Sequence, residues 1–169
     1  MLVVSDTSPI LNLAIIGQLG LLRAQFGTVS MPEAVFRELR LTADLPGNPA
    51  VRQAVGEGWL IKRLLQAPWT AAILSRELDE GEAETIAAAL EWKADLVLLD
   101  EKEARQIAKG SGLRVVGVLG ILLRAFSEGT LVDVENSLCR LQTEAHFRLS
   151  NDVLAEVAEQ VRRIRALRK

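Results

Sequence analysis

The stretch Val4-Ser5-Asp6-Thr7-Ser8-Pro9 decides how the chain begins to fold. It closes a short apolar run, Leu2–Ser5, which predicts a buried strand that stops at Asp6. Ser8 before Pro9 then predicts a helix with Ser8 as its N-cap and Pro9 at its first position, where proline is tolerated. A strand that passes directly into a helix is the repeating unit of an α/β fold.

The rest of the chain repeats this alternation. Further strands are predicted over residues 27–31, 59–65, 95–99 and 112–116, and helices over 9–16, 19–25, 32–39, 49–57, 79–92, 101–109 and 117–128. Continuous apolar strands of this kind are typical of a parallel sheet covered on both faces by helices. We therefore expect a three-layer, doubly wound α/β/α sandwich.

The tail after Leu131 is predicted to be helical and to end in an amphipathic helix from about Asn151 to Arg168. A length of 169 residues fits one domain of ordinary size. We expect a core over residues 1–130 and a helical extension over 131–169 that belongs to the same domain.

The composition excludes several classes of protein. Hydrophobic residues make up 49% and charged residues 25%, which indicates a globular chain. No apolar run reaches the roughly 18 residues of a membrane span, and the N-terminus lacks the basic and apolar regions of a secretory signal. The single Cys139 excludes an internal disulfide and fits a cytoplasmic location, and the single His146 excludes a multi-histidine zinc site.

Charge is unevenly distributed although the net charge is only −2. Residues 77–103 hold ten acids and two bases, whereas residues 140–169 hold seven bases and four acids. An acidic pocket for a cation beside a basic rim for an anion suits a nuclease. Two solvated helix faces are the alternative explanation of the same pattern.

Two predicted strands end in aspartate, namely at Asp6 and Asp100. Parallel strands place both carboxylates at one edge of the sheet, where open α/β sheets bind ligands, and such a pair can share Mg²⁺. Each residue also has a structural alternative. Asp100 fits an N-cap whose capping box Glu103 completes, and Asp6 fits an Asx-turn.

A third acid, Glu38, follows from helical spacing. Val35 and Leu39 mark the buried stripe of the helix after Pro32, which predicts that Glu38 lies on the inward side. A buried carboxylate needs a partner or a metal. The alternative is that Glu38 lies at the end of the stripe and reaches water or an arginine.

A fourth acid comes from the helix over 79–92, where Ala83, Ile86, Ala87 and Leu90 form the predicted core stripe. Glu82 and Glu84 flank this stripe in the first turn. The helix dipole favours acids there, which is a structural alternative to a functional role for either residue. Glu82 follows Gly81, a small residue that lets a ligand approach, so we rank it above Glu84.

These residues together resemble the motifs of PIN-domain ribonucleases. The resemblance rests on residues 4–10, 31–39, 78–87 and 98–105, in this order, and it implies that Asp6, Glu38, Glu82 and Asp100 are the family's catalytic, metal-binding acids. The family often has another acid about three residues after the fourth, a place that Glu103 occupies. Gly117 and Gly120 resemble the glycine pair found in one uncharacterised prokaryotic subgroup of the family.

The resemblance covers about residues 1–130 and implies a Rossmann-like sandwich with a four- or five-stranded parallel sheet. It implies cleavage of RNA by an endonuclease that depends on Mg²⁺ or Mn²⁺. Many similar proteins, in the VapC-like toxin superfamily, are the toxin of a toxin–antitoxin pair, form homodimers and are held inactive by a small antitoxin. We expect a homodimer, an RNA substrate and an antitoxin here.

The chemistry expected of the four acids follows from their repulsion, which favours the binding of one or two divalent cations that polarise a phosphate and activate a water. Ser8 is expected to orient an acid or a bound water, with Thr7 as the weaker choice. Arg105 and the arginines of the tail are expected to contact the RNA backbone. Trp59, Trp69 and Trp92 are better explained by packing than by base stacking.

Two other functions compete with this interpretation. A non-catalytic binding or regulatory module would keep the fold without metal chemistry. A phosphatase-like hydrolase with an aspartyl nucleophile at Asp6 would need a second aspartate two residues on, where Ser8 stands. Nucleotide binding is disfavoured because no glycine-rich phosphate-binding motif follows a strand.

Overall fold

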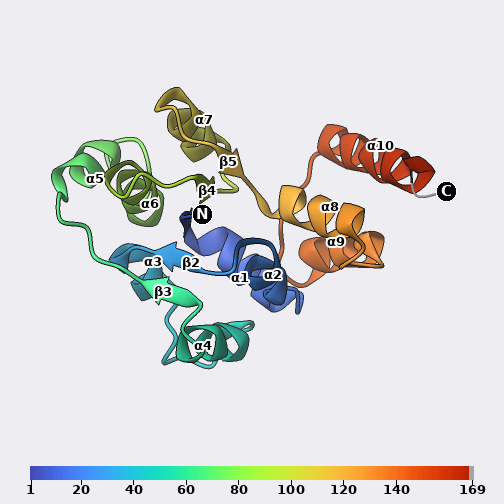
Figure 1. Ribbon diagram of the computed structural model, residues 1–169, viewed down its shortest axis with the longest axis horizontal. Coiled ribbons are helices and arrows are strands. Elements are labelled where there is room, and N and C mark those ends of the chain that lie inside the picture. Colours follow the sequence, from blue (N-terminus) through green and yellow to red (C-terminus); the bar gives the residue numbers. More distant parts are fainter. Residues whose placement is uncertain (168–169) are drawn as a thin grey trace.

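The computed structural model describes residues 1–167 and contains one parallel sheet, whose strand order is β3-β2-β1-β4-β5 (Figure 1). The five strands are β1 (Val3–Ser5), β2 (Val29–Met31), β3 (Leu60–Lys62), β4 (Leu96–Leu98) and β5 (Val115–Val116). Every neighbouring pair is parallel. The predicted α/β class and the all-parallel sheet are therefore confirmed, with five strands.

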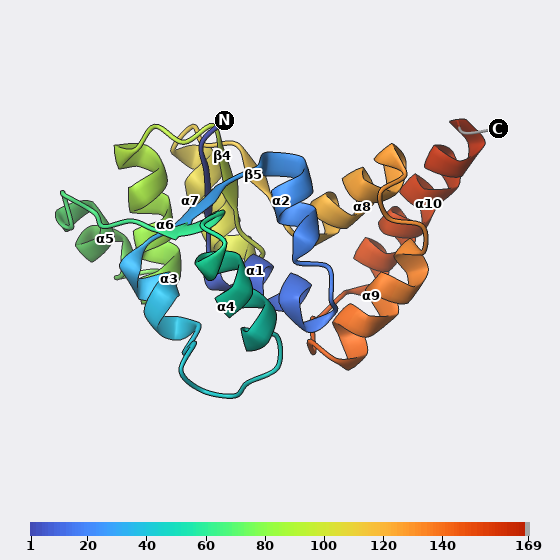
Figure 2. The same cartoon turned by 60° about the horizontal axis from the view of Figure 1, so that its bottom comes forward.

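Helices cover both faces of this sheet. Those described are α1 (Thr7–Ile15), α2 (Gly20–Phe26), α3 (Glu33–Glu38), α4 (Asn48–Gly56), α5 (Trp69–Leu74), α6 (Glu80–Glu91), α7 (Lys102–Gly110), α8 (Val118–Glu128), α9 (Val134–Thr143) and α10 (Asn151–Leu167). Figure 2 shows α6 and α7 on one side of the strands and α8 on the other. The arrangement is the expected three-layer sandwich.

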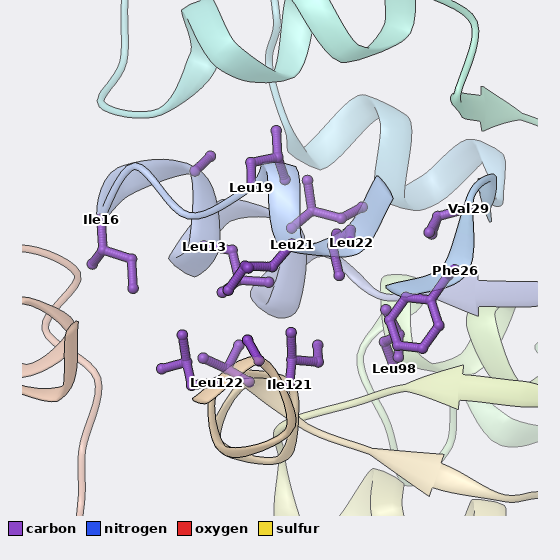
Figure 3. Packing of buried hydrophobic residues seen from close by; sticks show 14 of the residues in the cluster. Leu13, Ile16, Leu19, Leu21, Leu22, Phe26, Val29, Leu98, Ile121 and Leu122 are labelled. Atoms are coloured by element: carbon purple, nitrogen blue, oxygen red, sulfur yellow. The ribbon is translucent and has the colours of Figure 1, made fainter. Parts of the chain in front are cut away.

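Side chains of the central strands alternate between two buried clusters. Val3 and Leu98 face the cluster built with α1, α2 and α8, whereas Val4 and Val97 face the one built with α6 and α7. Figure 3 shows the first cluster, in which Leu13 and Leu22 lie opposite Leu122 and Ile121 of α8. This two-sided burial explains why the central strand β4 is apolar throughout and β1 is apolar up to Ser5.

The C-terminal extension packs on the same core. Leu141 of α9 and Val157 and Val161 of α10 belong to the cluster that contains α1 and α8. The last helix begins at Asn151 as predicted and is described to Leu167; Arg168 and Lys169 lie outside the described residues. Within residues 1–167, no helix is both long and apolar enough to span a membrane.

Three local predictions were wrong. No helix was predicted where α5 lies, because Trp69 and Ile73 on this six-residue helix are exposed and leave no buried stripe. Leu90 was expected in the core of α6 but is 39% exposed, and Ala88 and Ala89 are buried instead. The first helix begins at Thr7, so Pro9 is its third residue and Ser8 is not its N-cap.

Candidate active site at the strand ends

Asp6 and Asp100 follow the two central strands at the same edge of the sheet. Ser5 pairs in register with Leu98, and the backbone N–H of Asp6 donates to the carbonyl of Leu98 over 3.0 Å. Because β1 and β4 are adjacent and parallel, the two aspartates leave the sheet side by side. The chain order also reverses between these strands, which is where open α/β sheets bind ligands.

Asp6 stands at the N-cap position of α1, which corrects the prediction that Ser8 caps this helix. Its side chain makes no capping hydrogen bond, and its Oδ1 is buried without a hydrogen-bond partner among the described residues. Burial raises the pKa of Asp6 to about 7, and the nearby carboxylates of Asp79, Glu38 and Glu82 also raise it. The hydrogen bond from the Thr7 backbone N–H acts in the opposite direction. The carboxylate is thus not explained by a capping role.

Asp100 does not cap the helix that follows it, so the predicted capping box with Glu103 was wrong. Glu101 takes the N-cap position of α7, and Asp100 Oδ1 instead accepts the backbone N–H of Val118, at the start of α8, over 2.8 Å. Burial raises the pKa of Asp100 to about 6, although the Val118 N–H, Arg105 and Asn12 lower it. Its Oδ2 is buried and has no hydrogen-bond partner among residues 1–167.

Gly117 allows this placement of Asp100. A Cβ atom at Gly117 would lie 2.7 Å from Asp100 Oδ1, 2.8 Å from Arg105 Nη1 and 3.2 Å from the Leu99 carbonyl. Arg105 Nη1 itself donates to that carbonyl over 2.8 Å. Arg105, expected at the RNA backbone, is therefore already bonded within the wall of the site.

Glu38 is exposed, which corrects the prediction that it lies on the buried side of α3. It is held at the site from two directions. The Thr7 hydroxyl donates to Glu38 Oε2 over 2.5 Å, and Gly81 of α6 lies so close that an added Cβ would stand 2.7 Å from both carboxylate oxygens. The glycine therefore makes room for Glu38, and Thr7 rather than Ser8 positions an acid.

Glu82 is buried and forms a capping box with Asp79 at the start of α6. The Asp79 side chain accepts the Glu82 N–H over 2.8 Å, and the Glu82 carboxylate accepts the Asp79 N–H over 3.4 Å. Burial raises the pKa of Glu82 to about 7, and the carboxylates of Asp79, Glu101 and Glu103 also raise it. Glu103 is thus within electrostatic range of Glu82.

Glu84 has a different environment from Glu82. Its Oε2 accepts the backbone N–H of Ala34, in the first turn of α3, over 2.8 Å. This bond joins α6 to α3 and satisfies a helix N-terminus with a carboxylate, which the helix dipole favours.

The sequence did not single out two residues that the structure places here, Asp79 and Asn12, and it ranked a third, Thr7, below Ser8. Asp79 adds a charge beside Asp6 and Glu82, Asn12 lies beside Asp100, and Thr7 binds Glu38. The position of Asp79 directly before the helix, three residues ahead of Glu82, is a capping-box pattern that would have indicated it. We call Asp6, Glu38, Asp79, Glu82 and Asp100 the acidic cluster.

The acidic cluster offers carboxylate oxygens to a divalent cation. Within residues 1–167, no three acidic, histidine or cysteine side chains lie close enough together to hold a metal ion. However, Asp6 and Asp100 each carry a buried oxygen without a hydrogen-bond partner, and buried polar atoms normally have one. Mg²⁺ takes oxygen ligands and is commonly held by one or two carboxylates together with water. The two aspartates fit such an ion.

A groove of about 1200 Å³ opens from the Asp100 end of the acidic cluster. One wall is α7, with Lys102, Arg105 and Lys109, and the other is the segment Ala145–Ser150 between α9 and α10. Ser8 and Asn12 also line it. We call it the α7 groove.

Comparison with models of protein families gives a match. Residues 2–163 match the family model described as a PIN domain. No curated protein and no solved structure matches the chain. PIN domains are generally nucleases that act on RNA and typically use divalent metals. Since the match extends over nearly the whole chain and the fold is the expected one, this protein belongs to the PIN-domain family.

Proposed function

We propose that this protein is a metal-dependent endoribonuclease whose acidic residues Asp6, Glu38, Glu82 and Asp100 bind Mg²⁺ or Mn²⁺. The observation that carries the proposal is the pair of buried, unpartnered oxygens on Asp6 and Asp100 at adjacent strand ends. A cation there would replace the missing hydrogen bonds and neutralise charges that burial disfavours. The proposed catalytic core spans residues 1–130, and 131–169 is an extension of the same domain.

Each side chain has a distinct part in the proposal. Asp6 and Asp100 hold the cation, because their backbones are fixed by the sheet. Glu38 and Glu82 come from α3 and α6 and complete the negative charge around it, with Glu103 further out. When bound, the ion polarises the scissile phosphate and lowers the pKa of a water.

The burial of the acids also sets their protonation. In the absence of a cation, pKa values of about 7 for Asp6 and Glu82 leave these groups partly protonated at neutral pH. A bound cation favours their ionised forms, so binding releases protons. Proton release on binding is therefore an independent sign that these groups are ligands.

Cleavage of RNA by Asp6→Asn tests the proposal. The amide keeps the shape of the side chain and removes its charge, so cleavage with Mn²⁺ should fall by a factor of about 10² or more while the fold persists. Asp44→Asn is the matched control, because Asp44 is an exposed loop acid outside the cluster. Wild-type cleavage rates in Asp6→Asn would disprove the assignment.

Calorimetric titration with Mn²⁺ separates the enzyme from a non-catalytic binding module of the same fold. The proposed enzyme binds the ion and releases protons, and Asp100→Asn weakens binding. A wild-type protein that binds no Mn²⁺, with or without RNA, would favour the binding module.

We further propose that the protein is the toxin of a toxin–antitoxin pair and forms a homodimer. This proposal rests on the family alone. A small gene that overlaps the upstream end of this one, whose product restores growth when both are expressed, would support it. Growth that is unaffected by expression of the wild-type protein alone would argue against it.

A further inference from the structure

The α7 groove carries three cations that form no ion pair among the described residues. Lys102, Lys109 and Arg148 are exposed, and no carboxylate within residues 1–167 lies within ion-pair distance of them. The C-terminal helix is different. Arg162 and Arg163 pair there with Glu159, and Arg165 pairs with Glu135. Exposed cations elsewhere, such as Arg76, Lys93 and Arg114, also lack an ion pair, but Lys102, Lys109 and Arg148 lie together in one groove.

The cations of the groove lie on both of its walls, three on α7 and Arg148 on the wall opposite. On α7, Lys102, Arg105 and Lys109 are spaced i, i+3, i+7 and share one helix face that extends roughly 10 Å. On the opposite wall, the segment alternates between half-buried Phe147 and Leu149 and exposed side chains that include Arg148. Phe147 packs against the core and so holds this wall in place.

The two walls lie on either side of the connection between β5 and α8. Figure 1 shows this connection between α7 and α10, and the second wall directly precedes α10. At one end the groove reaches Asp100, whose Oδ2 lacks a partner. Charge along it therefore changes from acidic at the strand ends to basic along α7. A chain of phosphates laid in the groove meets cations along its length and carboxylates at one point.

We infer that the α7 groove binds the backbone of single-stranded RNA and leads it to the acidic cluster. This inference rests on the proposed function, because it assigns a path to that enzyme's substrate. Positively charged grooves that follow a phosphate backbone are typical of single-strand binding. Walls that contact the strand from both sides suit one strand, whereas a duplex is contacted mainly across its minor groove. His146, exposed in the same wall, offers a ring to an unstacked base.

Binding of a short fluorescein-labelled oligouridylate, measured by anisotropy in EDTA, tests the inference without cleavage. The double variant Lys109→Ala/Arg148→Ala should bind roughly tenfold more weakly at low salt, and the slope of log K against log salt should shrink by about 1.4, since each lost contact removes about 0.7. Arg162→Ala/Arg163→Ala is the matched control, because those arginines pair with Glu159, and it should bind like the wild type.

Each other outcome of this experiment overturns the inference. Wild-type binding by the groove variant would do so, and so would equal affinity for an oligoadenylate–oligouridylate duplex. A polyglutamate peptide that binds through Lys109 and Arg148 where RNA does not would assign the groove to an acidic protein. If only the proposed function is wrong, Asp6→Asn will cleave RNA like the wild type while RNA binding still depends on the groove. The two failures can therefore be distinguished.

Discussion

Replacing Gly81 by alanine should lower the rate of RNA cleavage while changing the stability of the fold little. An alanine Cβ would stand 2.7 Å from both carboxylate oxygens of Glu38, and an ordinary contact begins at 3.4 Å. The Glu38 carboxylate must therefore shift by about 0.7 Å or turn away. Because Glu38 is exposed and its carboxylate is the far end of a flexible side chain, this shift is mechanically easy.

The two consequences of Gly81→Ala have opposite signs. Alanine in place of glycine within α6 should stabilise the helix by about 0.5–1 kcal/mol, and loss of the Thr7–Glu38 hydrogen bond should cost about as much. The free energy of unfolding should therefore change by less than about 1 kcal/mol. Cleavage should fall by a factor of about 10², which is the typical effect of displacing a functional group by about 1 Å.

Urea unfolding and initial rates of RNA cleavage with Mn²⁺ measure both effects. Gly110→Ala is the matched control, because a Cβ there meets no atom within 4 Å. Adding Glu38→Gln to Gly81→Ala should lower the rate little further, since both changes remove the same carboxylate. Wild-type cleavage by Gly81→Ala, or a loss of activity that follows a large loss of stability, would refute the reasoning.

Three further predictions concern the other acids. The folded protein keeps a proton on Asp6 up to about pH 7, whereas the unfolded chain releases it near the ordinary pKa of 3.8. The resulting contribution to the free energy of unfolding is full below pH 3.8 and is lost as the pH rises through 7. Without divalent ions, urea unfolding should therefore show lower stability at about pH 8 than at about pH 5, by up to about 2.6 kcal/mol, and Asp6→Asn should shrink the difference; equal stabilities would contradict the assignment. Gly117→Ala should cost about 1–3 kcal/mol in thermal unfolding, because its Cβ would also press on the Leu99 backbone, and an unchanged melting temperature would refute that packing. Glu84→Gln should retain most RNA cleavage and lose about 0.5–1 kcal/mol, whereas Glu82→Gln should lose cleavage; the reverse result would make Glu84 the third acid.

The elements that position Asp6 and Asp100 could be predicted from local sequence. Continuous apolar runs such as Leu96–Leu98 indicate buried parallel strands, and an aspartate at the end of such a run must lie at the sheet edge. What could not be predicted is which backbone group Asp100 binds. Val118 is eighteen residues away, and only the closed fold brings its N–H to the carboxylate.

The position of Glu38 shows a second limit of sequence analysis. Helical spacing assigned it to a buried stripe, but α3 is only six residues long and Glu38 is its last residue, where the periodicity loses force. Its actual partners, Thr7 and Gly81, lie on two other helices. Such contacts depend on how α1, α3 and α6 pack together, which no pattern within α3 contains.

The strand order has a consequence for how the site is assembled. The chain lays down β1, β2 and β3 in one direction and then returns to place β4 and β5 on the other side of β1. Of the four proposed ligands, Asp6 and Glu38 belong to the first half, and Glu82 and Asp100 belong to the second. Neither half holds all four acids, and the repulsion of Asp6 by Asp79 and Glu82 arises only when the two halves dock. A cation that binds all four would act as a ligand of the docked state, so it would stabilise the contact between β1 and β4 together with the active enzyme.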